Sequence, residues 1–165
     1  MTPQVRAAKA LELLASRTSG VLCTHSERMA GFPYGSFAPY ALTARHEPFF
    51  FLSGLAVHTK NLQHNAKASL MVSEAEAAGA RLNIFGEILV VADESEISVM
   101  RSVYLALHPE AKHWISFGDF KFYRLQIANV YWVGGFGEMG WISAAEFTHQ
   151  PDAASLQDTD ATPGY

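Results

Sequence analysis

The spacing of hydrophobic positions along the chain predicts three helices. Residues 3–16 carry apolar side chains at intervals of three and four, which is the spacing of one helix face. Residues 56–65 form a polar helix directly after an apolar strand. A third helix begins after Asp93, which together with Glu96 resembles a capping box, and it ends before Pro109.

The remaining apolar segments are short and have the length and alternation of strands. Pro39 places the segment over residues 36–43 at an edge of the sheet or at a bulge. Gly86 predicts a bulge in the segment over residues 81–91. Because the strands mostly follow one another directly, the pattern favours a small antiparallel barrel with helical covers over a doubly wound parallel sheet. The predicted strands are residues 20–25, 36–43, 49–53, 68–73, 81–91, 121–127 and 130–133, with a further strand and helical turn over 141–147.

The pattern of helix and strand periodicity stops near the C-terminus. Residues 1–149 carry it without an internal repeat or a linker, so we expect them to form one domain. Residues 150–165 have no apolar periodicity, and we expect them to be a disordered polar tail.

The composition narrows the classes of partner. The chain has 165 residues, of which 49% are hydrophobic, and its formal net charge is −4. Asp152, Asp158 and Asp160 in the predicted tail carry three of these charges, so the folded part is nearly neutral. A protein that binds a phosphate backbone would need a basic excess, and nucleic acid is therefore not expected as a partner. A single bound phosphate is compatible with this balance.

Other features of the chain bear on its location. Cys23 is the single cysteine, which fits a reducing compartment. The first residues contain no continuous apolar segment of the kind that a secretory signal has. The longest apolar stretch, residues 48–57, is interrupted by Ser53 and Gly54 and is shorter than the ~20 residues that a membrane helix needs. We therefore expect a cytoplasmic protein without a membrane segment.

Familiar catalytic patterns receive little support from the sequence. The run from Gly135 to Gly140 matches the G-x-G-x-x-G of dinucleotide-binding folds, but too few residues follow it for a second βαβ unit. A sharp turn that needs small residues is the preferred interpretation. The 7 histidines show no H-x-H or H-E-x-x-H spacing, so a protein metal site is not expected. No G-x-S-x-G nucleophile motif is present.

A more specific pattern opens the predicted polar helix. His58, Thr59, Lys60 and Asn61 fall in its first turn, where free N–H groups and the helix dipole favour an anion. Their side chains add hydrogen-bond donors and one fixed positive charge, as a phosphate monoester requires. A solvated helix start with an incidental lysine is the alternative, and the sequence is equally compatible with it. Arg81 joins this group if its strand lies beside the start of the helix.

Several motifs occur in an order that resembles a known family. The most specific are LAVHTKNL, within residues 51–72, and the stretch from GDFKFYRL to VGGFG, within residues 118–142. GVLCTH (20–25), GFPYGSFAPYAL (31–42) and RLNIFGEI (81–88) complete the series. With these motifs the chain resembles the flavin-binding split-barrel proteins related to pyridoxamine 5′-phosphate oxidase, and among them the haem-utilisation (HugZ-like) branch.

The resemblance implies a mainly β fold with flanking helices. The expected architecture is a six-stranded antiparallel split β-barrel that forms a homodimer, with FMN at the subunit interface. Residues 36–40 would lie along the flavin, the first turn of the polar helix would take the phosphate, and the turn over 134–137 would approach from the late strands. The residues expected to contact FMN are Ser36, Tyr40, Leu52, Ser53, His58, Thr59, Lys60, Asn61, Arg81 and Trp141.

Departures from the family pattern leave three functions open. The C-terminal Trp/Arg motif with which the oxidases bind vitamin phosphate is not visible in this chain. Haem-degrading members use a C-terminal histidine as the haem ligand, for which this chain offers His149, and Asp119 matches an acidic position of that branch. We expect an FMN-dependent oxidoreductase that acts on a small molecule or on oxygen. The alternatives are a haem-binding or haem-degrading protein and a flavin-binding carrier or sensor without turnover.

Overall fold

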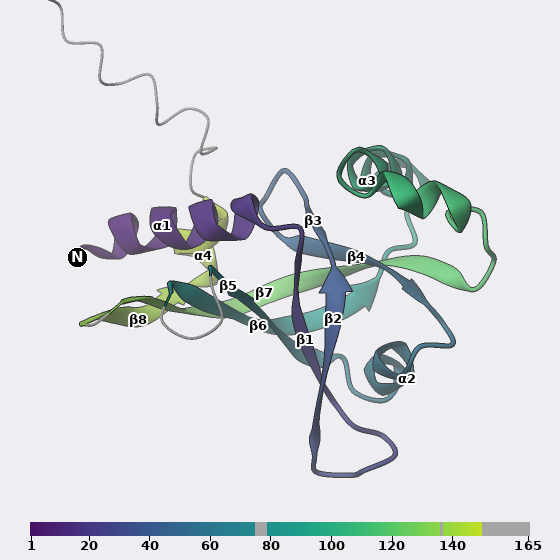
Figure 1. Ribbon diagram of the computed structural model, residues 1–165, viewed down its shortest axis with the longest axis horizontal. Helices are drawn as coiled ribbons and strands as arrows, with labels where there is room; N and C mark the ends of the chain where they lie inside the picture. Colours follow the sequence, from purple (N-terminus) through teal and green to yellow (C-terminus); the bar gives the residue numbers. More distant parts are fainter. Residues whose placement is uncertain (75–78, 136, 150–165) are drawn as a thin grey trace, which may run out of the picture.

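Eight strands form one antiparallel sheet that curls until β2 contacts β4 (Figure 1). The order across the sheet is β2-β1-β5-β6-β7-β4-β3, and β8 pairs with β7. The predicted mainly β class is confirmed, although the sheet has eight strands rather than six. The computed structural model describes residues 1–74, 79–135 and 137–149, so the predicted tail lies outside the described residues. The strands are β1 (Ser19–His25), β2 (Pro33–Pro39), β3 (Ala41–Leu42), β4 (Pro48–Ser53), β5 (Lys67–Ser73), β6 (Arg81–Val90), β7 (Phe120–Gly135) and β8 (Glu138–Ser143).

Helices pack around the curled sheet at separate places (Figure 1). The first helix has its predicted bounds, and the Thr2 hydroxyl caps it by accepting a hydrogen bond from the Val5 amide at 3.3 Å. It packs against the last helix, and the second helix packs against β1. No helix of the described residues is both long and apolar enough to cross a membrane. The helices are α1 (Pro3–Ser16), α2 (Val57–His64), α3 (Glu94–Leu107), the 3-10 helix η1 (Pro109–His113) and α4 (Ala144–Thr148).

The larger hydrophobic cluster lies inside the curled sheet. Alternate residues of the strands point into it, because successive side chains of a strand lie on opposite faces. Buried members from the strands include Leu22, Leu70, Ile84, Leu125 and Val130, and those from the helices include Ala7, Leu11, Leu14 and Phe147. α1 and α4 therefore close the core from the same side.

A smaller cluster lies between α3 and the other face of β4 and β7. Its members include Phe49, Phe51, Met100, Tyr104 and Phe122. In β4, Phe49 and Phe51 point into this cluster, whereas Phe50 and Leu52 point into the larger one. Both faces of β4 are buried, which explains its continuous apolar sequence.

β7 is one continuous strand where the sequence predicts two, over residues 121–127 and 130–133. Ala128 is an extra residue in its pairing with β6, so the strand carries a β-bulge. The bulge shifts the alternation by one residue, and this shift made one strand resemble two. The positions that point into the larger cluster are Tyr123, Leu125 and Ile127 before the bulge and Val130 and Trp132 after it.

Gly86 of β6 lies opposite this bulge, at the place where the sequence predicts one. The extra residue belongs to the partner strand rather than to β6 itself. A Cβ at Gly86 would lie 2.0 Å from the carbonyl oxygen of Gln126. The close approach of the two backbones therefore requires glycine at this position.

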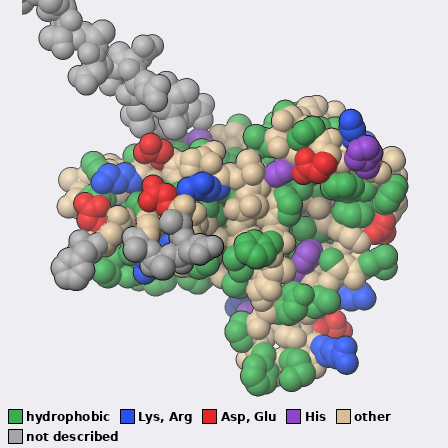
Figure 2. All heavy atoms as spheres, viewed as in Figure 1, with side chains coloured by type: hydrophobic (Ala, Val, Ile, Leu, Met, Phe, Trp, Pro, Cys, Tyr) green, Lys and Arg blue, Asp and Glu red, His purple; other side chains and the backbone are tan. Residues whose placement is uncertain are grey.

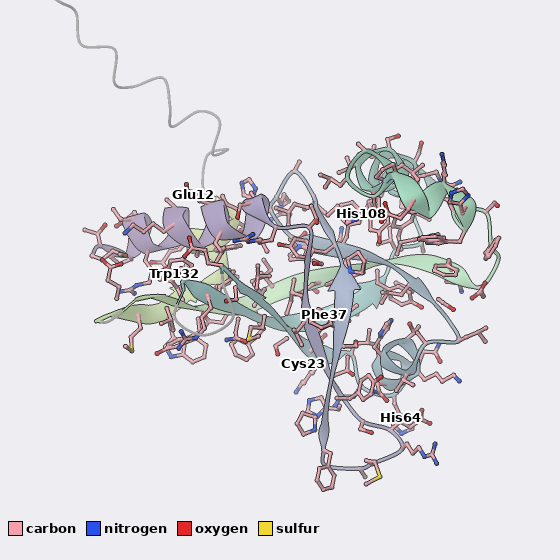
Figure 3. The ribbon with its side chains drawn as sticks, in the orientation of Figure 1. Glu12, Cys23, Phe37, His64, His108 and Trp132 are labelled. Carbon is pink, nitrogen blue, oxygen red and sulfur yellow. The ribbon has the colours of Figure 1, made fainter. Side chains whose placement is uncertain are left out.

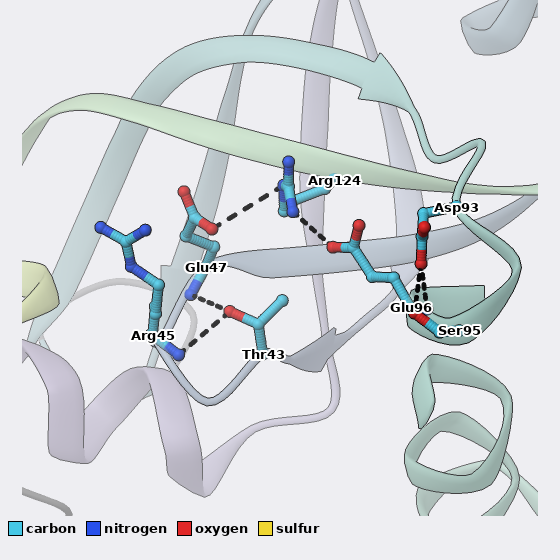
Figure 4. A network of polar contacts seen from close by, with 7 residues as sticks. All are labelled: Thr43, Arg45, Glu47, Asp93, Ser95, Glu96 and Arg124. Atoms are coloured by element: carbon cyan, nitrogen blue, oxygen red, sulfur yellow. Dashed lines mark hydrogen bonds and ion pairs between the residues drawn. The ribbon is translucent and has the colours of Figure 1, made fainter. Parts of the chain in front are cut away.

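Arg124 of β7 fastens α3 to the sheet (Figure 4). Its guanidinium binds the carboxylate of Glu96 in the first turn of α3, and its Nε lies 3.8 Å from a carboxylate oxygen of Glu47. Asp93 caps α3 as predicted, accepting a hydrogen bond from the Glu96 amide at 2.8 Å. The capping box predicted for this helix is only half formed. The Glu96 carboxylate binds Arg124 instead, because a charge-assisted bond is stronger than one to a neutral amide.

The face of the sheet that points away from the larger cluster is covered only in part. α3 covers it over β4 and the first half of β7, while the described helices leave it uncovered over β1, β2, β5, β6, β8 and the second half of β7. We call this uncovered area the open sheet face. The paired positions that cross it in a row are Phe37, Val21, Met71, Asn83, Tyr131 and Trp141.

Large apolar side chains on this face remain in contact with solvent. Phe37 is 83% exposed and Trp141 is 58% exposed. Hydrophobic side chains also gather at the protruding end of the β1–β2 hairpin (Figure 2), where Met29 and Phe32 are exposed. Several exposed apolar side chains on one face are typical of an interaction surface.

Candidate functional site

The first turn of α2 presents free hydrogen-bond donors. Its N-cap is Ala56, which has no side-chain acceptor, and no acidic residue stands in the turn. The first helical bond runs from the Lys60 amide to the Ala56 carbonyl oxygen at 3.1 Å. The amides of residues 57–59 precede that bond, at the positive end of the helix dipole, and are left for an external acceptor.

Two side chains make this turn more suitable for an anion. The Thr59 hydroxyl is fully buried and has no hydrogen-bond partner among the described residues. Lys60 is exposed and forms no ion pair with the described part of the chain. Leaving a buried hydroxyl without a partner costs about 1–3 kcal/mol, so a ligand oxygen that reached Thr59 would remove that cost.

His58 and Ser36 meet beside the same turn. The Ser36 hydroxyl oxygen of β2 lies 3.1 Å from Nδ1 of His58. Burial lowers the pKa of His58, because the half-buried ring loses hydration of its charged form. The imidazole is therefore neutral at neutral pH, and a bound anion would favour its protonation. Two of the residues expected to contact FMN are thus brought together across α2 and β2.

Asn61 is engaged within the chain. Its amide donates to the Thr24 hydroxyl oxygen at 3.0 Å, and its carbonyl oxygen accepts from the Glu27 amide at 3.0 Å. The side chain is buried and connects α2 to β1 and to the residues that follow it. In this structure the Asn61 side chain therefore positions the helix within the chain and is not available to an external ligand.

Other residues expected at the flavin lie in the interior. Tyr40 is buried, and its hydroxyl donates to the Leu14 carbonyl oxygen at 2.7 Å. Burial raises its pKa. Its own carbonyl oxygen lies 2.9 Å from Nε2 of His108, under α3 (Figure 3). Leu52 belongs to the larger cluster. Sequence could not show this burial, because it depends on how α1 and α3 pack on the strands.

Ser53 follows Leu52 and is turned toward another loop. Its hydroxyl donates to a carboxylate oxygen of Asp119 at 2.6 Å and accepts from the Leu55 amide at 3.1 Å. The acidic residue of the GDF motif therefore holds the turn that leads into α2. The two hydrogen bonds of Ser53 thus fix the backbone just before the first turn of α2.

Arg81 and Trp141 lie on the open sheet face, away from α2. Trp141 packs against Phe85 and Tyr131, with ring centroids 5.7 and 4.9 Å apart. Arg81 begins β6, whereas the residues after α2 bond to Ile88 near its other end, about 20 Å along the strand. One chain does not bring Arg81 or Trp141 to the first turn of α2.

His149 lies at the end of α4. Nδ1 of His149 lies 2.8 Å from the carbonyl oxygen of Ala145, and the side chain is exposed. α4 packs with α1 on the core side of the sheet, so within one chain His149 does not share a cavity with the open sheet face.

A groove of about 450 Å³ on the open sheet face was not predicted. The one imidazole that lines it belongs to His25 at the end of β1, which is exposed and whose side chain forms no hydrogen bond or ion pair with the described residues. Cys23 lies two residues earlier, beside the strand that carries Phe37 (Figure 3). We call this cavity the His25 groove. It is lined by Cys23, Thr24, His25, Pro33, Lys67, Ala68, Ser69, Phe85, Gly86, Glu87 and Ala128.

The sequence alone indicates only one part of this groove, the shared face of Cys23 and His25. Cys23 and His25 are two residues apart, so a strand places both on one face. The strands that complete the groove, β5 and β6, follow much later in the chain, and only the observed register brings Ser69 and Phe85 beside Cys23. The alternation of side chains along a strand therefore predicts that Cys23 and His25 share a face of the sheet, but it does not predict a groove there.

Solved structures share this architecture. A haem-binding protein from Mycobacterium smegmatis superposes with a TM-score of 0.78 at 27% identity, over 90% of this chain and 60% of its own. A protein of the pyridoxinephosphate oxidase family from Clostridium acetobutylicum superposes with a TM-score of 0.70 at 13% identity, over 87% of this chain and 98% of its own. The fold therefore defines the split-barrel class.

Sequence comparison gives the family. The family described as CREG, β-barrel matches residues 1–149. The chain is 36% identical over 141 residues to the chloroplastic non-canonical haem oxygenase HOZ of Arabidopsis thaliana, covering 84% of this chain and 43% of that protein. This chain belongs to the CREG β-barrel family. It spans less than half the length of the Arabidopsis relative, and the resemblance to the haem-utilisation branch is confirmed at the level of family and fold.

The contacts of Asn61 lead to a stability prediction. Asn61→Ala is expected to lower the free energy of unfolding by about 1–3 kcal/mol, because the Thr24 hydroxyl and the Glu27 amide lose their partner. Chemical denaturation measures this change. Gln63→Ala, at an exposed position of the same helix, is the matched control. Equal stability of the two variants would contradict the positioning role.

Proposed function

We propose that this protein binds haem on the open sheet face and takes part in haem breakdown. The observation that carries the proposal is the His25 groove, where one exposed imidazole stands among largely apolar walls. Two similar proteins support it, since the Arabidopsis relative is named a haem oxygenase and the M. smegmatis structure a haem-binding protein. The chain spans only part of each of these proteins.

The residues of the groove fit one side of a tetrapyrrole. Phe85, Ala68 and Ala128 supply an apolar wall, and His25 supplies a nitrogen of the kind that ligates haem iron. Lys67 offers a cation for a propionate, while Glu87 would repel a propionate placed next to it. The groove holds a flat ligand from one side only, so a second wall is required.

The chain's own residues would bind and orient the group. When bound, haem supplies an iron that reacts with dioxygen, and the protein supplies position and environment. His25 would hold the iron from one side, Lys67 would fix the orientation of the ring, and Phe85 would exclude water from its face. The Cys23 thiol beside them is consistent with the reducing, cytoplasmic compartment expected from the sequence.

A second copy of the chain is the proposed source of the other wall. Phe37 and Trp141 are exposed at the two ends of the row that crosses this face, and exposed large apolar side chains gathered on one face mark surfaces that partners cover. In a twofold homodimer the same surface patch meets its own copy, so both subunits would complete two equivalent sites. The expected interface cofactor site is retained in this proposal, with haem as the ligand.

Titration with ferric haem tests the proposal. Wild-type protein is expected to give a saturable Soret band, and His25→Ala is expected to shift the band and weaken binding roughly tenfold or more, because the iron loses its nitrogen ligand. His113→Ala, in η1 and away from the groove, is the matched control. With ascorbate, air and catalase, the Soret absorbance of the wild-type complex should decay faster than that of free haem.

Two outcomes would overturn this assignment. The spectrum and affinity of His25→Ala could equal those of His113→Ala, which would remove the groove from haem binding. Alternatively, His149→Ala could abolish the band while His25→Ala keeps it, which would place the ligand on α4.

The first turn of α2 favours FMN as a second candidate. We infer that an FMN phosphate would accept hydrogen bonds from the amides of residues 57–59 and from the buried Thr59 hydroxyl, and would pair with Lys60. Ser36 stands beside His58 at this site. Such a flavoprotein would be an oxidoreductase for a small molecule or oxygen, or else a carrier or sensor without turnover.

The flavin proposal has its own test. Lys60→Ala is expected to weaken FMN binding by about 1.5–3 kcal/mol, through loss of one charge-assisted bond. Flavin fluorescence quenching measures the dissociation constant, and Lys112→Ala is the control for loss of a distant lysine. An unchanged constant in Lys60→Ala would refute the phosphate assignment. Bleaching by reduced nicotinamide with recovery in air would distinguish an oxidoreductase from a carrier.

A further inference from the structure

A second groove, of about 620 Å³, lies where α3 meets β4, β6 and the start of β7. It is separate from both sites described above, since it shares no lining residue with the His25 groove or with the first turn of α2. We call it the Phe117 groove. Its lining residues come from α3, from three strands and from the loop after η1, so a ligand here would contact parts distant in sequence.

Aromatic side chains form the apolar part of this groove. Phe51 and Phe122 are buried in the cluster beneath α3. Phe120 packs on Phe51 with ring centroids 5.0 Å apart, and its ring also meets that of Phe117 edge to face at 6.3 Å. Phe117 is 55% exposed, so the aromatic row runs from the core to the surface. An apolar ligand could extend this row outward.

Two positive charges line the same groove. Arg101 belongs to α3 and Lys121 to β7, and neither forms a hydrogen bond or ion pair through its side chain with the described residues. Glu94 lines the groove as well, which leaves a net charge of about one positive unit. Asp119 is not among the residues that line the groove, and its carboxylate accepts the hydrogen bond of the Ser53 hydroxyl at 2.6 Å.

We propose that the Phe117 groove binds a small amphipathic carboxylate with an aromatic or aliphatic body. The apolar body would lie on the Phe117–Phe120 row, and the carboxylate would pair with Arg101 and Lys121. The volume falls within the range of about 300–1,000 Å³ that small ligands occupy. One net positive charge matches a monoanion and is too weak for a polyanion. This site stands independently of the proposed haem and flavin functions.

Binding of anilinonaphthalene sulfonate, displaced by decanoate, tests the proposal. Wild-type protein is expected to bind the probe saturably and to release it to decanoate but not to decanol, which lacks the charge. Arg101→Gln/Lys121→Gln is expected to weaken decanoate binding about tenfold or more. Lys112→Gln, an exposed lysine of η1 outside the groove, is the matched control and should leave the affinity unchanged.

A filling variant separates this groove from the open sheet face. Ser116 is exposed and lines the groove, so Ser116→Trp should block decanoate without a change in melting temperature. Three results would overturn the proposal: equal affinity in the double variant and the wild type, equal displacement by decanol and decanoate, or unchanged decanoate binding in Ser116→Trp.

Discussion

The β-bulge at Ala128 is the constraint on which the two ends of the structure depend. Gly86 permits it, because any Cβ there would lie 2.0 Å from the Gln126 carbonyl oxygen. Before the bulge, β7 pairs with β4 and its outer face carries α3. After the bulge, β7 pairs with β8 and its outer face is uncovered. The bulge in β7 thus divides the sheet into an end that α3 covers and the open sheet face.

This separation gives the chain two kinds of cavity. At the covered end, α3 and the aromatic residues of β4 and β7 line the Phe117 groove, so its walls come from one chain. On the open sheet face, the His25 groove has one wall only, and the exposed Phe37 and Trp141 extend the same surface. α2 supplies a third element, an uncapped helix start held in place by Asn61. We propose that a ligand on the open face depends on the assembly of two copies, whereas one beneath α3 would bind to a single chain.

Features that depend on nearby residues were predictable from the sequence. The bounds of α1 follow from local chemistry, and Gly86 marked the place of the irregular pairing, although the bulge lies in β7. The turn predicted between Gly135 and Gly140 is shorter, since Gly140 already belongs to β8. Features that depend on register and packing were not. The alternation that shifts at Ala128 suggested two strands, and the burial of Tyr40 depends on its bond to α1. Phe85 lies on the same face as Cys23 and His25 because β1 pairs with β5 and β5 pairs with β6. No single segment of the sequence predicts these pairings.

We propose that one surface, the open sheet face, forms both the homodimer and the haem site. Size-exclusion chromatography with light scattering, recorded together with Soret absorbance, tests both parts at once. We expect haem to elute with a particle of two chains. Trp141→Glu, which places a charge in the apolar row, should give a single chain without haem. A wild-type single chain that carries haem would contradict it.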